Sequence, residues 1–159
     1  MEQAIVVVEG SPYEQGIGQG KQLVELIHYN VEIVRTKLKE AKCDNKRYWD
    51  FVQRNVRFME RKHTDLYDEM RGIAQGAGMP LQDIFMINIP AYFLTEQLNQ
   101  ECSMLLARGK ATLDGKTYVI KNRDMSMDVR QVVIHRFYDN GTSIVEVNGA
   151  GIVTYPASG

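Results

Sequence analysis

The sequence predicts an α+β protein in which helices occupy the first hundred residues and an antiparallel sheet follows. Before residue 90, apolar residues recur at helical spacing with Lys, Arg and Glu between them. After Cys102 they form short β-branched runs, separated by the hairpin signals Asp114-Gly115 and Asn140-Gly141. No repeat, low-complexity tract or linker divides the halves. We therefore expect one domain over residues 1–159 with a shared core.

Local signals place the first strand and the start of the first helix. Residues 4–8 form a β-branched run that ends at Gly10, as is typical of a short buried strand. Ser11 can cap the following helix, because Pro12 suits its first position and Glu14 stands where a capping box places its acid. A strand followed directly by a capped helix is therefore predicted.

Four helices are predicted in the first half. One continues from Pro12 to Leu38, a second spans about 46–61, a third capped by Thr64 runs to Gly76-Ala77-Gly78, and a fourth begins at Pro80 and is interrupted near Pro90. The glycines near the start of the first helix weaken it by about 1 kcal/mol each relative to alanine. These are Gly16, Gly18 and Gly20. We expect another element to pack closely against them.

The second half is predicted to be an antiparallel sheet. Its strands are expected over residues 103–107, 117–121, 132–138, 143–147 and 152–155. The sequence ends at Gly159 directly after the last of them, so we expect the chain to be truncated. Exposed sheet edges in such a piece would favour self-association into a homo-oligomer.

Charge and composition exclude several classes of partner. Nineteen basic and twenty acidic residues give a formal charge of −1, so no chain-wide field would recruit nucleic acid or a membrane. Glu2 and a short apolar run do not make a secretory signal, which predicts a cytoplasmic protein. In a reducing compartment, Cys43 and Cys102 are expected to be free thiols.

Two motifs invite ligand sites that we do not favour. The cluster Gly16-Ile17-Gly18-Gln19-Gly20-Lys21 could suggest a nucleotide-binding module, but it matches neither Gly-x-Gly-x-x-Gly nor the Walker pattern, and no parallel βαβ unit is expected after it. Close helix packing explains it better. His28, His63 and His135 lie far apart without helical pairing, so we predict no metal site and no cofactor.

The two cysteines differ in their positions. Cys43 lies in a predicted turn between helices with no base nearby, and we interpret it as structural. Cys102 stands where the helical half ends and the sheet begins. Taken alone, a strand cysteine is more often a small buried hydrophobe than a nucleophile. One hypothesis is therefore a catalytically silent binding or structural piece with Cys102 buried.

The surroundings of Cys102 favour a nucleophile. The stretch Glu101-Cys102-Ser103-Met104-Leu105-Leu106-Ala107-Arg108, the turn Asp114-Gly115-Lys116, and Thr117-Tyr118-Val119-Ile120-Lys121-Asn122-Arg123-Asp124 are similar to the isopenicillin N acyltransferase-like amino-terminal-nucleophile (Ntn) hydrolases. Conjugated bile acid (choloylglycine) hydrolases are more distant members of the same group. The segment 69–78 and the glycine-rich helix start also resemble the acyltransferase branch. The departures are Ser103, where Thr is commoner, and Lys121, where bile acid hydrolases carry Arg.

The resemblance implies a fold and a self-processing mechanism. The chain would be the front part of a four-layer αββα fold, cut by itself between Glu101 and Cys102 into a helical piece, 1–101, and the start of the catalytic sheet, 102–159. The new α-amino group of Cys102 would act as the base, since it titrates near 7.7 to 8. Asp124 would orient that group, and Asn122 would hold the strand end.

The resemblance also implies an activity. It predicts a cysteine amidohydrolase or acyltransferase acting on an acylated small molecule, with acyl-coenzyme A as one conceivable donor. Lys121 would stand on the substrate side, although a lysine cannot make a bidentate guanidinium contact. In the relatives, further oxyanion donors come from sheet segments beyond anything that corresponds to residue 159. We therefore expect this chain to lack activity without that remainder.

Overall fold

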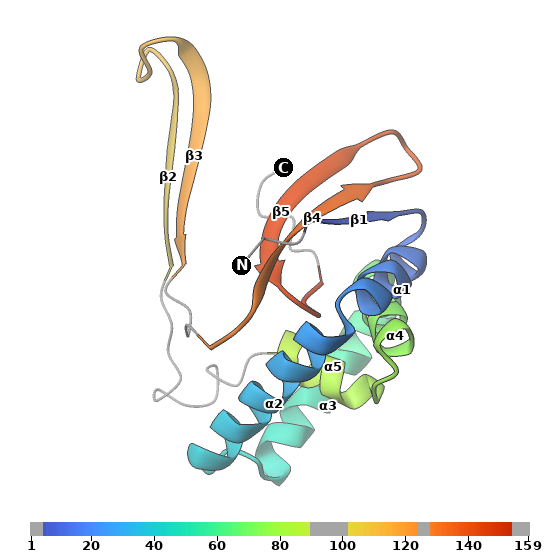
Figure 1. Ribbon diagram of the computed structural model, residues 1–159. Coiled ribbons are helices and arrows are strands. Elements are labelled where there is room, and N and C mark those ends of the chain that lie inside the picture. Colours follow the sequence, from blue (N-terminus) through green and yellow to red (C-terminus); the bar gives the residue numbers. More distant parts are fainter. Residues whose placement is uncertain (1–4, 90–101, 124–127, 154–159) are drawn as a thin grey trace.

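The protein is an α+β structure with five helices and two small sheets (Figure 1). The computed structural model describes residues 5–89, 102–123 and 128–153. In chain order the elements are β1 (Ile5–Glu9), α1 (Pro12–Gln22), α2 (Val24–Glu40), α3 (Lys46–Lys62), α4 (Thr64–Ala77), α5 (Leu81–Asn88), β2 (Cys102–Gly109), β3 (Gly115–Arg123), β4 (Gln131–Phe137) and β5 (Ser143–Gly149). The predicted sequence of helices and strands is thus largely confirmed.

The pairing of the strands differs from the prediction. β1 runs parallel to β4, with Ile5 opposite Val133, and β4 runs antiparallel to β5, so one sheet has the order β1-β4-β5. β2 and β3 pair only with each other, as a separate antiparallel hairpin. The expectations of a single antiparallel sheet and of no parallel unit were wrong. Periodicity identifies a strand but not its neighbour, and β1 from the first half takes the place beside β4.

Several predicted boundaries also change. The first predicted helix is two helices, because Leu23 leaves helical geometry at φ −120° and separates α1 from α2. Thr64 is the first residue of α4 and not its cap, which is His63. Residues 152–153 form no strand and follow a turn at 150–151. Residues 154–155 and the interruption at Pro90 lie outside the described residues.

The predicted cap and hairpin signals are confirmed. Ser11 and Glu14 form a complete capping box, in which the Ser11 amide donates to Glu14 Oε2 at 2.9 Å. Both Gly115 and Gly141 adopt positive φ, at +71° and +83°, in the turns where Asp-Gly and Asn-Gly signals stand. These short-range signals were sufficient because each depends only on neighbouring residues.

Helices α1 and α4 touch backbone to backbone. A Cβ atom built on Gly16 would lie 2.2 Å from the carbonyl oxygen of Glu69, and one on Gly72 would lie 2.1 Å from that of Tyr13. Gly20 and Gly76 make similar close approaches one turn further along. The predicted close packing is therefore confirmed. Because Gly16 and Gly20 face the α4 backbone, they cannot also cradle a phosphate.

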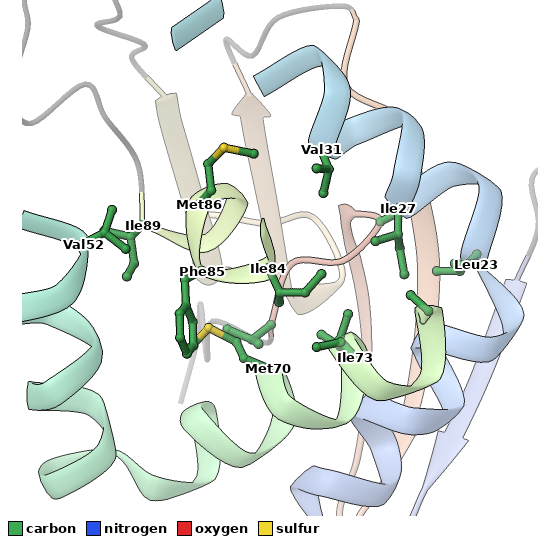
Figure 2. Close-up of a cluster of buried hydrophobic side chains, with 14 of the residues drawn as sticks. Leu23, Ile27, Val31, Val52, Met70, Ile73, Ile84, Phe85, Met86 and Ile89 are labelled. Carbon is green, nitrogen blue, oxygen red and sulfur yellow. The ribbon is translucent and has the colours of Figure 1, made fainter. Parts of the chain in front are cut away.

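The core lies among the helices and continues to the inner face of the three-stranded sheet. Figure 2 shows side chains of α2, α4 and α5, among them Ile27, Ile73 and Ile84, meeting between the helices. From the sheet, the buried members are Val6, Val8, Val132 and Ile134. Burial of each such side chain contributes roughly 1.5–3 kcal/mol. The core therefore binds β1, β4 and the helices into one unit.

A buried asparagine on α2 ties both ends of the β4–β5 region to the helices. The Asn30 amide nitrogen donates to the carbonyl oxygens of Arg130 and Ala150, each at 3.0 Å, and its oxygen accepts from the Arg130 amide at 2.7 Å. Both N–H donors and the oxygen of the Asn30 side chain are therefore bonded to backbone groups. Asn30 is 2% exposed, so water does not replace these bonds.

The turn after β5 is held by two further buried amides. Asn88 donates to the Gly151 carbonyl at 2.9 Å and accepts from the Val153 amide at 2.9 Å. Gln19 accepts from the Gly151 amide at 3.1 Å. Helices α1, α2 and α5 thus each supply an amide side chain that stands in for the ladder partner this segment lacks.

Gly72→Ala tests the backbone contact between α1 and α4. The added methyl group would force the helices apart, and we expect the free energy of unfolding to fall by about 2–3 kcal/mol. Chemical denaturation followed by circular dichroism measures this. Gly18→Ala is the matched control, because its Cβ would meet only the Val8 side chain, at 3.2 Å, and we expect a change within about 1 kcal/mol. Equal effects would contradict the proposed packing.

Asn30→Asp tests the amide fastening with almost no change in shape. The carboxylate would present an acceptor where the amide nitrogen now donates to two carbonyls, so we expect a loss of about 3 kcal/mol at neutral pH. The comparison is Asn55→Asp on α3, where the amide nitrogen donates to a single carbonyl, that of Phe51. Urea unfolding of both variants should show a much larger loss for Asn30. A loss at Asn30 no larger than that at Asn55 would rule out the role.

Candidate active site

The β2–β3 hairpin determines which candidate residues lie together. Cys102 is the first residue of β2 and stands opposite Arg123, the last residue of β3. Ser103 is opposite Asn122 and Met104 is opposite Lys121. Directly opposed residues of antiparallel strands have Cα atoms about 4.5–5.5 Å apart. Cys102, Lys121 and Asn122 therefore all lie near the open end of one hairpin, where strand alternation places Lys121 on the same face as Cys102 and Asn122 on the opposite face.

Two predicted site residues cannot be placed. Glu101, on the other side of the predicted cleavage point, and Asp124, the predicted partner of the new α-amino group, lie outside the described residues. The side chain of Cys102 is also outside them, whereas Lys121 and Asn122 are exposed. The candidate site is thus defined by the backbone register at the open end of the hairpin.

The closed end of the hairpin is fixed by its turn. Asp114 accepts from the Tyr118 hydroxyl at 2.8 Å and from the Lys116 amide at 3.1 Å. The Tyr118 hydrogen bond is the main reason that the pKa of Asp114 is lowered, and the same bond to a carboxylate raises the pKa of Tyr118. A bulge between Ala107 and Gly109 adjusts the register. This turn therefore determines which residue stands opposite Cys102.

The hairpin projects from the rest of the molecule (Figure 1), and none of its described residues belongs to the hydrophobic core that the helices share with β1 and β4. Its apolar side chains are largely exposed on both faces. They are Met104, Leu105, Leu106, Tyr118, Val119 and Ile120, with exposed fractions of 50 to 64%. The hairpin adds no side chain to the helical core because β1, β4 and β5 already close that core.

A buried charge cluster, which we did not predict, joins the helices to the sheet. Arg136 of β4 is fully buried and contacts Glu69 of α4 at 2.9 Å and Glu146 of β5 at 2.6 Å. Its guanidinium also donates to Gln15 Oε1 at 3.3 Å. Strand alternation could have indicated that Arg136 is buried, because it lies two positions after the inward residue Ile134. The cluster holds no nucleophile, and its one guanidinium is paired with two carboxylates, so we assign it to structure.

The histidines and Cys43 have ordinary environments. His28 Nε2 lies 3.2 Å from the Ala77 carbonyl oxygen, while His63 and His135 pack against phenylalanine rings. Within residues 5–89, 102–123 and 128–153, no group of three His, Cys, Asp or Glu side chains could hold a metal ion. Cys43 is half-buried, and its thiol lies 3.4 Å from the Ala41 carbonyl oxygen, in agreement with the structural interpretation.

The helices of the described segments include none with the length and apolarity needed to cross a bilayer.

Comparison with known proteins finds no protein-family model that matches the chain and no curated protein that matches it significantly.

Proposed function

We propose that the chain belongs to a self-processing cysteine Ntn enzyme, an amidohydrolase or acyltransferase that acts on a small-molecule acyl amide or thioester. The observation that carries the proposal is the position of Cys102 at the start of β2, opposite the end of β3. A nucleophile at a strand terminus is held by the sheet but remains accessible at its edge. The motif around it resembles the isopenicillin N acyltransferase-like enzymes, as described above.

Self-processing would convert Cys102 into an amino-terminal residue. Its thiol attacks the Glu101 carbonyl carbon, the peptide C–N bond breaks, and the α-amino group leaves with a proton as a thioester forms. Water then hydrolyses the thioester and gives the Glu101 carboxylate and a free Cys102 thiol. The new α-amine has a pKa near 7.7 to 8, so part of it is neutral at pH 7 and can accept the thiol proton.

The same groups would carry out turnover. The Cys102 thiolate attacks the substrate carbonyl, the α-ammonium donates a proton to the leaving group, and the thioester acyl-enzyme passes its acyl group to water or to an acceptor amine. Asn122 and Asp124 would support the amino terminus, and Lys121 would face the substrate. The free thiol suits a reducing cytoplasmic compartment, which we propose as the location.

The contacts between the two pieces support a stable cleaved form. β1 of the first piece pairs with β4 of the second over five residue pairs. Arg136 of the second piece contacts Glu69 of the first, and Asn30 and Asn88 of the first bind backbone of the second. These contacts are buried, and none of them involves β2, at whose first residue the Glu101–Cys102 peptide would break. Breaking that peptide would therefore leave the helical piece attached to the sheet.

The outer face of the β1-β4-β5 sheet supports the proposed four-layer αββα architecture. One cross-strand row on this face is Ile5–Val133–Val147, and the next is Val7–His135–Val145. Ile5 and Val145 are 69% and 65% exposed, while the opposite face of the sheet is buried against helices. Six apolar or weakly polar side chains in register form the kind of face that packs on a second sheet.

Intact-mass spectrometry of freshly purified protein tests the processing step. We expect two masses, for residues 1–101 and 102–159, and we expect Cys102→Ala to give only the uncleaved mass, because it removes the attacking thiol. Cys43→Ala is the matched control and should still be cleaved. Amino-terminal sequencing of the smaller piece should begin Cys-Ser-Met.

Two results would contradict this function. If neither this chain nor one extended at its carboxyl end is cleaved between Glu101 and Cys102, the self-processing claim fails. If cleavage is absent and Cys102 also reacts with thiol reagents no faster than an ordinary buried thiol at neutral pH, the alternative hypothesis of a silent structural piece is supported instead.

Val145→Lys tests whether a second sheet covers the outer face of the β1-β4-β5 sheet. In a longer chain that supplies a second sheet, a charge on this face would be buried, and we expect a loss of about 2–3 kcal/mol in the free energy of unfolding. Thr142→Lys, in the exposed β4–β5 turn, is the control and should change it by less than about 0.5 kcal/mol. Denaturant titration measures both. Equally small losses in the longer chain would argue against a stacked sheet.

A further inference from the structure

Helix α3 concentrates positive charge that the balanced composition conceals. Six of the nineteen basic residues of the chain lie within Lys46–Lys62, together with two acids. The helix is strongly amphipathic. Its inward face is formed by Tyr48, Val52 and Val56, which are buried in the core. Its outward face is therefore fixed by core packing, and its orientation does not depend on any partner.

The outward face carries a straight stripe of arginines. Arg47, Arg54, Arg57 and Arg61 are spaced by seven, three and four residues, which places them on one side of an α-helix. The stripe is about 21 Å long at 1.5 Å per residue. All four side chains are exposed. The cationic stripe is defined by these four residues.

The stripe keeps its charge. Two acids are helical neighbours of the stripe: Asp50, whose carboxylate Lys46 contacts at 2.6 Å, and Glu60, three residues after Arg57. In the part of the chain that the structure describes, none of the four arginines makes an ion pair. Their guanidinium groups are therefore available to an external anion.

An exposed aromatic ring accompanies the arginines. Phe58 follows Arg57 on the same side of α3 and is 55% exposed. Its ring lies 5.4 Å from that of His63, at the end of the helix, and is tilted against it. Phe58 is not among the residues that form the core or pack against it, so its exposed surface can contact a partner.

We propose that the cationic stripe, together with Phe58, docks this protein on the surface of an anionic lipid bilayer. Four to eight basic residues on an amphipathic helix match the pattern that binds anionic headgroups. A guanidinium group fits phosphate geometry, and a neighbouring phenyl ring can enter the boundary between headgroups and acyl chains. A convex, straight stripe lets a flat surface contact all four arginines at once.

The structure also predicts the character of this docking. Because the apolar face of α3 is committed to the core, the helix cannot insert, and binding is peripheral and salt-dependent. The formal charge of the chain as a whole is −1, so an anionic surface attracts α3 and repels the more acidic remainder. Docking would therefore impose one orientation on the molecule.

Co-sedimentation with vesicles tests the proposal. We expect the protein to bind vesicles of phosphatidylcholine mixed with phosphatidylserine, not to bind phosphatidylcholine alone, and to be released by high salt. The double variant Arg54→Glu with Arg57→Glu should lower the partition coefficient by at least about 20-fold. Phe58→Ala should lower it by about threefold without changing its salt dependence.

The matched control makes the same change in net charge at a different place on the protein surface. Arg108→Glu with Lys110→Glu lies on the exposed β2–β3 hairpin and should leave binding within about twofold of the unmodified protein. Circular dichroism of both double variants verifies the fold. If the α3 variant is unfolded, Arg54→Gln with Arg57→Gln replaces it, with an expected loss of about tenfold.

Three outcomes would overturn the proposal. The first is absence of binding to anionic vesicles at low salt, and the second is an equal loss of binding in the hairpin control. The third is that single-stranded RNA displaces the protein from sedimented vesicles at a lower concentration of negative charge than competing anionic vesicles do, which would assign the stripe to nucleic acid. Cys102→Ala should bind vesicles as the unmodified protein does, so the outcome is separate from that of the proposed catalytic function.

Discussion

The backbone contact between α1 and α4 is the constraint on which the rest of the structure depends. Gly16 and Gly72 let two helices that are far apart in sequence approach until Cβ atoms would not fit between them. This contact brings α4 beside the sheet against which α1 lies, so Glu69 can reach Arg136 of β4. With larger residues at the contact, α4 would move outward and leave the Arg136 guanidinium buried with less compensation, which is a costly arrangement.

Buried polar groups specify the arrangement that apolar burial alone would leave loose. Leucine in place of Asn30 or Asn88 could fill the same space, but the backbone of the turn after β5 would then lose its hydrogen-bond partners. Beyond β5 the Ala150 amide still donates to the Arg130 carbonyl at 3.0 Å, and the helices supply further hydrogen bonds to this turn. The structure thus uses amide side chains to select one position for a segment that has little regular structure of its own.

What the sequence could predict depends on the range of the interaction concerned. The capping box of Ser11, the turn at Gly115 and the helix spacing of α3 are local, and each was predicted correctly. The parallel pairing of β1 with β4 joins residues more than a hundred positions apart and leaves no periodic trace. Arg136 was missed because a charged residue at an inward position contradicts the expected polarity, and only strand alternation could have indicated it.

The candidate site shows the same limit. The motif around Cys102 was local enough to predict that a hairpin would bring the cysteine towards Lys121 and Asn122, and the register agrees with that arrangement. The roles of Glu101 and Asp124 depend on side-chain geometry at the end of the hairpin, which neither spacing nor register determines.

The separation of the hairpin from the core has a consequence for catalysis. In the proposed mechanism, a nucleophile on an element that stabilises little of the helical core would be cleaved, acylated and regenerated without disturbing the contacts at Gly16 and Arg136 that hold the molecule together. The apolar faces of that hairpin, and the open face that includes Val145, cost hydration free energy while they remain exposed. In the four-layer arrangement that we propose, covering these faces and completing the environment of Cys102 would be the same event, which would couple the assembly of the layers to the proposed activity.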